Sequence, residues 1–168
     1  MSLQKHNKKK FSELIQKNQK IIHKIAMIYT NSSVEREDLF QEICLQLWRS
    51  YSNFREEAQF STWIYRIALN TAISTIRKKN KYSDFEPIKE SLLPAETTED
   101  TENVKMLYLA ISKLNNIDKA LILLWLEDKS YNVIATVLGI TRSNVSVKLV
   151  RIKRKLEELV NESVKLES

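Results

Sequence analysis

Basic side chains gather on one short stretch near the end of this chain, and the chemistry they offer is contact with phosphate. Between Arg142 and Lys155 the sequence carries six basic residues and no acidic residue. Lysine and arginine neutralise nucleic-acid phosphates, while short polar side chains such as Asn144 reach the edges of bases. The stretch predicts a DNA-binding helix. The alternative is an ordinary helical hairpin with a solvated, lysine-rich face.

The residues before this stretch predict a helix-turn-helix. Gly139 is the only glycine of the chain and separates two helical patterns with almost no connector. A tight turn between helices favours a residue that accepts positive φ. Ala135 is small where the helices would cross, and Thr141 is suited to cap the second helix. Such a unit fits the major groove of DNA.

A second group of residues combines aromatic rings with cations. Trp63 and nearby Phe60 stand at the start of a predicted helix, and we expect Ser61 to cap that helix and its body to run from residue 62 to about 81. The helix carries Arg66 early and basic residues at its end. Rings that stack on bases, beside cations that follow phosphates, suit single-stranded DNA. Alternatively, Trp63 is a core residue and the basic end complements the helix dipole.

A third group is an exposed polar patch on a predicted helix. Ser32 and Glu35 have the spacing of a capping box, which starts this helix. The patch lies opposite an apolar row and consists of Asp38, Gln41 and Glu42, which are three and four residues apart. It is either a binding surface or solvated surface.

Composition excludes several classes of protein. His6 and His23 are the only histidines, and neither lies near a cysteine or carboxylate at metal-ligand spacing. A single glycine leaves no phosphate-binding loop and no dinucleotide fingerprint. We therefore expect no catalytic residue, no metal, no cofactor and no enzyme activity.

The chain also lacks the marks of a membrane or secreted protein. No apolar run approaches the length that spans a bilayer, and the first residues do not resemble a secretory signal. Cys44 is alone, so it forms no internal disulfide, as fits a cytoplasmic protein without membrane insertion. The net charge of +6 favours an anionic partner.

Scarce glycine and proline, with abundant leucine, isoleucine, lysine and glutamate, predict an all-α fold. Acidic residues and both prolines concentrate between Asp84 and Glu102. This stretch predicts an acidic linker between two small helical domains, the second ending in the helix-turn-helix. The alternative is a solvated loop. The expected bounds are 1–82 for the first domain, 83–102 for the linker and 103–168 for the second domain.

Together, the groups resemble a bacterial RNA polymerase sigma factor of the small, two-domain extracytoplasmic-function (ECF) group of the sigma-70 family. The resemblance runs from about Phe11 to Leu159, and the end of the chain looks most like members from Bacteroidetes. It is carried by the helix-turn-helix and by three earlier motifs, Glu37-Asp38-Leu39-Phe40-Gln41-Glu42, Leu47-Trp48 and Phe60-Ser61-Thr62-Trp63-Ile64-Tyr65-Arg66-Ile67-Ala68-Leu69-Asn70.

The resemblance implies a role for each group. The polymerase-binding residues, which would contact the β′ clamp helices of core RNA polymerase, are Asp38, Gln41 and Glu42. The residues implied at the minus-ten element, where a base of the non-template single strand is flipped out, are Asn53, Phe54, Arg55, Phe60, Trp63, Arg66, Asn70, Arg77, Lys78 and Lys79. The residues implied at the minus-thirty-five element, which is duplex DNA, are Arg142, Ser143, Asn144, Ser146, Val147, Lys148, Arg151 and Arg154.

The resemblance further implies the β flap of the polymerase and an anti-sigma factor as partners. The residues themselves leave two other interpretations open. One is a helix-turn-helix regulator that binds duplex DNA without joining polymerase, and the other is a helical adaptor whose basic face binds an acidic protein.

Two departures from the family pattern affect local stability. Val133 stands where a glutamate is usual, which removes the reciprocal cap for Ser130. Asn115 and Asn116 replace a more common helix start, so we expect a less sharply defined onset there.

Overall fold

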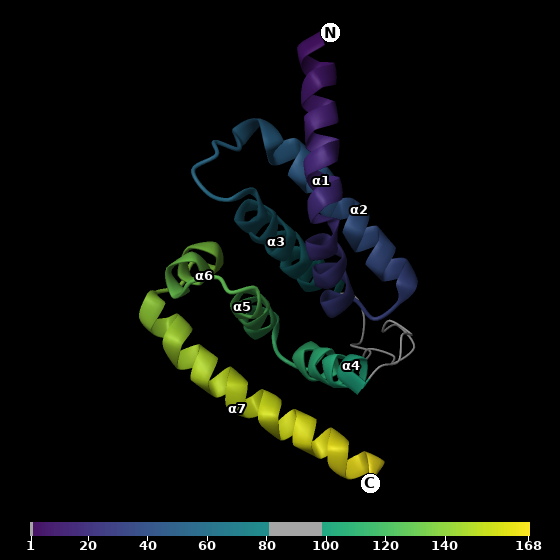
Figure 1. Cartoon of the computed structure of the whole chain (residues 1–168), viewed down its shortest axis with the longest axis vertical. Coiled ribbons are helices and arrows are strands. Elements are labelled where there is room, and N and C mark those ends of the chain that lie inside the picture. The colour runs from purple at the N-terminus through teal and green to yellow at the C-terminus, as the bar shows by residue number, and fades with distance from the viewer. Residues whose placement is uncertain (1, 81–98) are drawn as a thin grey trace. The chain divides into compact units, whose positions relative to one another are not determined.

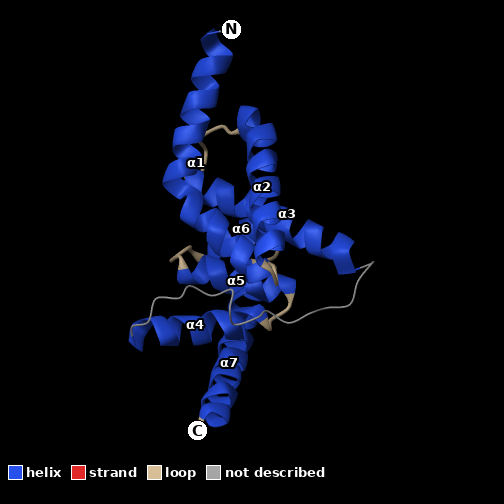
Figure 2. Ribbon diagram, turned by 90° about the vertical axis from the view of Figure 1, so that its right-hand side faces the viewer, coloured by secondary structure: helices blue, strands red, loops and turns tan. Residues whose placement is uncertain are grey.

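The computed structural model describes residues 2–80 and 99–168, and every regular element within these two ranges is helical (Figure 1, Figure 2). The all-α prediction is confirmed. The chain divides after residue 84 into two compact units, each with its own set of packed helices.

The first unit is a bundle of three long helices, with a single short turn of 3-10 helix after the second. Its elements are α1 (Ser2–Tyr29), α2 (Ser33–Ser50), η1 (Tyr51–Asn53) and α3 (Phe60–Asn80). Each of the three long helices packs against the other two. The fully buried contacts between them include Ile25 of α1, Ile43 of α2 and Ile64 of α3. Burial of such apolar side chains drives the packing.

The second unit consists of four helices, and the last is the longest. They are α4 (Glu99–Ser112), α5 (Asn116–Leu126), α6 (Tyr131–Leu138) and α7 (Arg142–Glu167). Helix α5 is buried without a break from Lys119 to Leu124, as expected for the central helix of a small core. Helices α4, α5 and α6 each pack against α7.

The predicted acidic linker lies mostly outside the described residues. Its last part, residues 99–102, belongs to α4. The domain and linker bounds themselves stay a prediction. Acidic residues such as Glu102 near a helix start interact favourably with the helix dipole, and Glu102 also pairs with Lys105 at 3.4 Å.

The onset of α5 is also better defined than expected. The Asn115 Oδ1 accepts a hydrogen bond from the Asp118 backbone N–H at 2.9 Å, and the Asn115 Nδ2 donates to the Asp118 carboxylate at 2.9 Å. Asparagine is among the best N-cap residues, so Asn115 defines the start of α5.

Candidate nucleic-acid interface

The connection between α6 and α7 has the geometry of a helix-turn-helix. Gly139 lies in the left-handed region with φ 67° and ψ 34°, and the Ile140 backbone N–H donates to the Ala135 carbonyl at 3.1 Å. Ser130 caps α6 through the Val133 N–H at 3.2 Å. The predicted cap of α7 is confirmed, because the Thr141 Oγ1 accepts from the Asn144 N–H at 3.1 Å.

Helix α7 has one face turned to the core and one turned outward. Val145, Leu149, Ile152 and Leu156 are buried, at spacings of four, three and four residues. The predicted minus-thirty-five residues are exposed except for Lys148, which is half-buried; the exposed ones are Arg142, Ser143, Asn144, Ser146, Val147, Arg151 and Arg154. The helix therefore presents cations, short polar groups and the exposed Val147 on one outer surface.

One basic residue of α7 has a structural contact that the sequence did not reveal. The Lys153 Nζ lies 4.0 Å from the ring centroid of Trp125 in α5. A cation over a tryptophan face is attracted by the ring quadrupole, so this lysine helps to hold α7 against α5.

Six aromatic rings of the first unit form one continuous series of contacts, which we call the aromatic cluster. It consists of Phe11, Trp48, Tyr51, Phe54, Phe60 and Trp63. The three predicted minus-ten aromatics meet one another: Phe54 lies 5.3 Å from Phe60 and 5.1 Å from Trp63, and Phe60 lies 5.2 Å from Trp63, between ring centroids. All three are half-buried, so each ring both packs on its neighbours and reaches the surface.

Helix α3 begins at Phe60, two residues before the predicted start, and ends at Asn80. The Trp63 backbone N–H donates to the Gln59 carbonyl at 3.2 Å, which closes the first turn ahead of Ser61. Ser61 is thus inside the helix, and its predicted role as the cap was wrong.

The predicted DNA-contacting residues of α3 face away from the core. Arg66, Asn70 and Arg77 are exposed, whereas Tyr65 and Leu69 on the opposite side are buried. Lys78 and Lys79 follow in the last turn and are also exposed. In the loop before α3, Asn53 and Arg55 are exposed as well.

The predicted polar patch lies on the outer side of α2. Asp38 and Gln41 are exposed and Glu42 is half-buried, while Leu39 and Ile43 point into the core. The Glu42 carboxylate accepts a hydrogen bond from the Gln46 Nε2 at 2.9 Å. Asp38 and Gln41 expose their carboxylate and amide groups on this outer side of α2.

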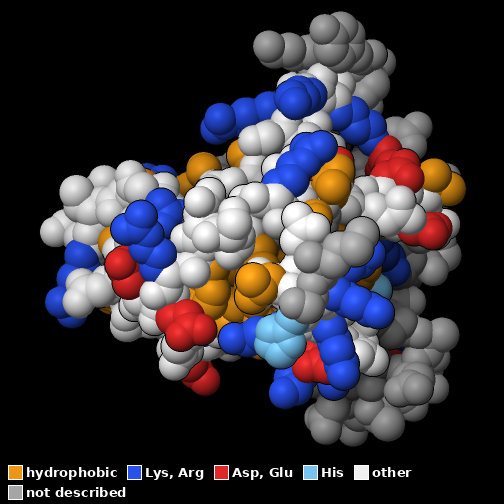
Figure 3. Space-filling view, turned by 90° about the horizontal axis from the view of Figure 1, so that it is seen from above, with side chains coloured by type: hydrophobic (Ala, Val, Ile, Leu, Met, Phe, Trp, Pro, Cys, Tyr) orange, Lys and Arg blue, Asp and Glu red, His pale blue; other side chains and the backbone are white. Residues whose placement is uncertain are grey.

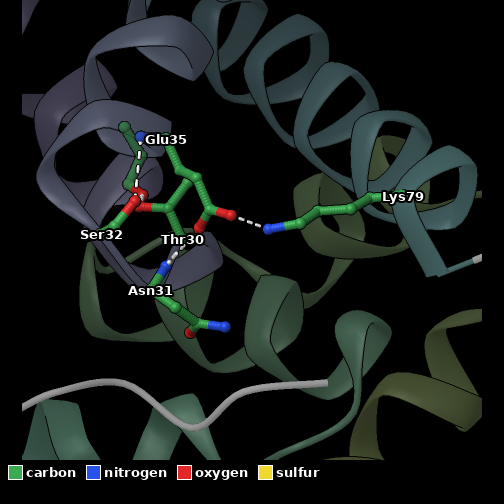
Figure 4. A network of polar contacts seen from close by, with 6 residues as sticks. Thr30, Asn31, Ser32, Glu35 and Lys79 are labelled. Atoms are coloured by element: carbon green, nitrogen blue, oxygen red, sulfur yellow. Dashed lines mark hydrogen bonds and ion pairs between the residues drawn. The ribbon is translucent and has the colours of Figure 1, made fainter. Parts of the chain in front are cut away.

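A surface hollow of about 540 Å³ joins this patch to the end of α3, which sequence analysis did not foresee. Asp38 and Glu42 line it from α2, and Lys78 and Lys79 line it from α3. At its edge Glu35 forms an ion pair with Lys79, as Figure 4 shows. The same glutamate accepts from the Asn31 N–H at 3.0 Å and donates its own N–H to Ser32 Oγ at 3.2 Å. The capping box is thus confirmed, with its reciprocal bond one residue earlier than the usual position.

The face drawn in Figure 3 carries many lysine and arginine side chains, with hydrophobic side chains reaching the surface among them.

Cys44 is half-buried, and burial raises the pKa of its thiol. Within residues 2–80 and 99–168, no group of three histidine, cysteine or carboxylate side chains has the arrangement of a metal site.

No single helix in the described ranges is long and apolar enough to cross a bilayer. The pair α6 and α7, bent by 99° at the turn, passes the same test by length and composition alone.

Comparison with known protein families gives matches to both units. The model of sigma-70 region 2 matches residues 14–82, and the model of sigma-70 region 4 matches residues 105–156. The two segments occur in the order that the sequence motifs indicated.

Curated relatives are similar along most of the chain. The ECF RNA polymerase sigma-E factor of Haemophilus influenzae is 27% identical over 180 residues, which cover 94% of this chain and 91% of the relative. SigX of Bacillus subtilis is 28% identical over 152 residues, covering 79% of this chain and 78% of the relative. SigM of Mycobacterium tuberculosis is 22% identical over 152 residues, covering 89% of this chain and 76% of the relative.

Two solved structures have the same fold. RpoE from Bartonella quintana, in complex with the anti-sigma factor NepR, superposes with a TM-score of 0.70 at 17% identity and covers 91% of this chain and 98% of its own. CnrH in complex with the cytosolic domain of CnrY gives a TM-score of 0.66 at 19% identity, and the match covers 92% of this chain and 90% of CnrH. The predicted similarity to members from Bacteroidetes stays a prediction.

Proposed function

We infer the roles of these surfaces from one premise: the chain belongs to the ECF group of the sigma-70 family, and it is an alternative sigma factor that directs transcription initiation. We propose that it binds core RNA polymerase, recognises a promoter at two elements and opens the DNA strands at the minus-ten element. The proposal assigns residues 1–82 to polymerase and the minus-ten element, and residues 103–168 to the minus-thirty-five element.

The observation that carries the proposal is the chemical difference between the two units. One unit exposes an aromatic cluster beside Arg66 and the basic end of α3, which suits an unpaired strand. The other exposes the polar and basic outer face of α7, which suits the major groove. A regulator of duplex DNA alone has no need of the first surface.

In the first unit we propose that Phe54, Phe60 and Trp63 stack against bases of the non-template strand. Flipping out a base costs a few kcal/mol, and stacking of about 1–3 kcal/mol per base offsets it. Asn53 and Arg55 lie in the adjoining loop and would contact the flipped base or its backbone. The exposed residues of α3 would follow the DNA backbone upstream; they are Arg66, Asn70, Arg77, Lys78 and Lys79.

In the second unit we propose a division between base and backbone contacts. Arg142, Ser143, Asn144, Ser146 and Val147 lie in the first turns of α7 and would face base edges. The outward Val147 is suited to the methyl group of thymine. Lys148, Arg151 and Arg154 lie further along and would contact phosphates, which supply affinity without sequence preference.

We propose the α2 patch as the polymerase contact. The clamp helices of the β′ subunit would bind Asp38, Gln41 and Glu42, with the β flap contacting the second unit. An anti-sigma factor is the further partner we propose, because the structural relative RpoE is in complex with the anti-sigma factor NepR. A protein with these partners acts in the cytoplasm and needs no catalytic residue, metal or cofactor of its own.

The test is transcription from a promoter library by the purified chain with core polymerase. Specific transcripts support the proposal. DNA binding without initiation would instead make the chain a regulator of duplex DNA, and absence of both would make it an adaptor.

The α2 patch has its own test, with a matched control in the same unit. We expect Asp38→Ala with Gln41→Ala to weaken binding to core polymerase at least tenfold, because truncating one partner of a buried, hydrogen-bonded charge pair at an interface costs about 2 kcal/mol or more. The control pair, Glu13→Ala with Gln16→Ala, removes an equally spaced, exposed acid and amide from α1. Equal affinities of the two double variants would remove the proposed role of the patch.

A further inference from the structure

The first turns of α1 extend beyond the rest of the first unit (Figure 1). Residues 3–10 are all exposed, and Phe11 is the first residue of the helix that is buried. This projecting segment buries no apolar side chain, so its sequence is not explained by the packing of the bundle.

The projecting segment is strongly basic. It carries Lys5, Lys8, Lys9 and Lys10, which we call the lysine arm, and Lys17 and Lys20 continue the exposed charge along the same helix. Glu13 is the only acidic residue of α1. Within the described parts of the chain, no carboxylate forms an ion pair with a lysine of the arm.

The position of these charges opposes helix stability. The first turns of a helix carry the positive end of its dipole, where anions stabilise and cations destabilise, by about 0.3–1 kcal/mol each. Helix α1 has no acidic residue in its first turn and four lysines close behind it. A bound anion would reverse this unfavourable arrangement by neutralising both the lysines and the dipole.

The charge and shape of the arm favour a nucleic-acid backbone over a membrane. A membrane-binding helix needs an apolar face to insert, yet between residues 2 and 10 Leu3 is the only large apolar side chain. Lysine is a flexible point charge that contacts phosphate without reading the base.

The arm also adjoins the aromatic cluster. The Phe11 ring, one residue after Lys10, lies 5.0 Å from Trp48 and 5.1 Å from Tyr51, between ring centroids. Tyr51 in turn lies 6.4 Å from Trp63. A DNA strand that leaves the rings near Phe60 can therefore continue over exposed Trp48 toward the lysine arm.

We propose that the lysine arm binds the phosphate backbone of DNA without sequence preference and extends the strand-binding surface of the first unit beyond the aromatic cluster. This inference deepens the proposed function by adding a contact outside the two promoter elements. The arm contributes affinity that depends steeply on salt.

The experiment measures binding of the full chain to a mixed-sequence oligonucleotide, single-stranded and duplex, by fluorescence anisotropy over a series of salt concentrations. The test variant replaces Lys5, Lys8, Lys9 and Lys10 with alanine. We expect about tenfold weaker binding at low salt, and a log–log salt slope shallower by up to about 3, because each lost phosphate contact removes about 0.7 on single strands. Alanine favours helix, so far-UV circular dichroism of the variant should show no loss of helicity.

Two controls separate the arm from net charge. Arginine at the same four positions keeps the charge and should keep the affinity and the slope. The pair Lys9→Ala with Lys10→Ala should weaken binding more than Lys113→Ala with Lys165→Ala, which removes the same charge from exposed positions of the second unit.

Equal losses in the two pairs, or unchanged binding by the fourfold alanine variant, would overturn the proposal. So would arm-dependent binding to phosphatidylserine vesicles with no effect on DNA. Because the oligonucleotide has no promoter element and the assay contains no polymerase, a negative result here leaves the proposed function standing. Failure of the wild-type chain to initiate transcription would contradict the proposed function but not the DNA binding by the lysine arm.

Discussion

At the scale of single residues, Gly139 lies in a backbone conformation that favours glycine. We expect Gly139→Ala to destabilise the second unit by about 1–2 kcal/mol, because a side chain in the left-handed region is strained. A Cβ at this position meets no atom within 4 Å, so no clash adds to the cost. Urea unfolding measures the change. Gly139→Asn should cost less, since asparagine tolerates this region; an equal loss in both variants would show that the backbone conformation is not the cause.

Lys119 gives the second unit a pH-dependent stability. The residue is 6% exposed in α5, and burial lowers the pKa of its ammonium group below the ordinary 10.5. Between the lowered folded pKa and 10.5 the unfolded chain binds more protons than the folded one, so stability rises with pH across that window. Below that window Lys119 is charged in both the folded and the unfolded chain, so the full cost of burying its charge lowers the stability of the folded state.

Urea titrations from neutral pH toward 10.5 measure this rise. Lys119→Met keeps the length of the side chain and removes the charge, so it should abolish the part of the rise that comes from this residue. Identical pH profiles of the variant and the wild-type chain would contradict the assignment.

At the scale of elements, the start of α2 joins folding to the candidate polymerase surface. Ser32 caps the helix that carries Asp38 and Gln41, and Glu35 ties the same turn to Lys79 of α3. We expect Ser32→Ala to destabilise the first unit by about 1 kcal/mol, the usual cost of losing an N-cap side chain. Ser33→Ala is the matched control, because Ser33 is exposed and follows the cap directly. Denaturant unfolding of both variants decides: equal stabilities would mean that the cap contributes nothing.

The ion pair between Glu35 and Lys79 adds little to the free energy of unfolding. Their side chains are 33% and 47% exposed, so solvent screens the attraction. The main effect of the contact is on the orientation of Lys79, whose side chain turns toward the hollow beside α2 (Figure 4).

Elements and caps were predictable from the sequence because their signals are local. Ser32 with Glu35, Gly139 and Thr141 each act within a few residues, and each was confirmed in place. The apolar rows of α2 and α7 likewise follow from helical spacing alone. The start of α3 was predicted two residues too late. Ser61 is a residue type that often caps a helix, whereas the backbone hydrogen bond from the Trp63 N–H to the Gln59 carbonyl has no signal in the sequence.

Contacts between distant elements were not predictable in this way. Lys153 meets Trp125, and Lys79 meets Glu35, only after the helices have packed. The hollow that joins the α2 patch to the basic end of α3 has the same origin. Sequence motifs supplied the residues of the candidate interfaces, whereas their neighbours came from tertiary structure.

At the scale of the whole molecule, two sets of helices support two different surfaces, and stability should be distributed accordingly. Helices α1, α2 and α3 pack with one another, and α4, α5 and α6 pack with α7. Leu47 is fully buried in α2, and Ile134 is fully buried in α6. We expect Leu47→Ala and Ile134→Ala each to cost about 2–5 kcal/mol, through lost burial and a residual cavity. Amide hydrogen exchange resolved by peptide locates each loss. Leu47→Ala should raise exchange within residues 11–80 and leave α5 and α7 protected, while Ile134→Ala should do the reverse. If either variant raised exchange equally in both units, the chain would unfold as one cooperative body, and the division of the two proposed DNA-binding surfaces into separately stable units would be wrong.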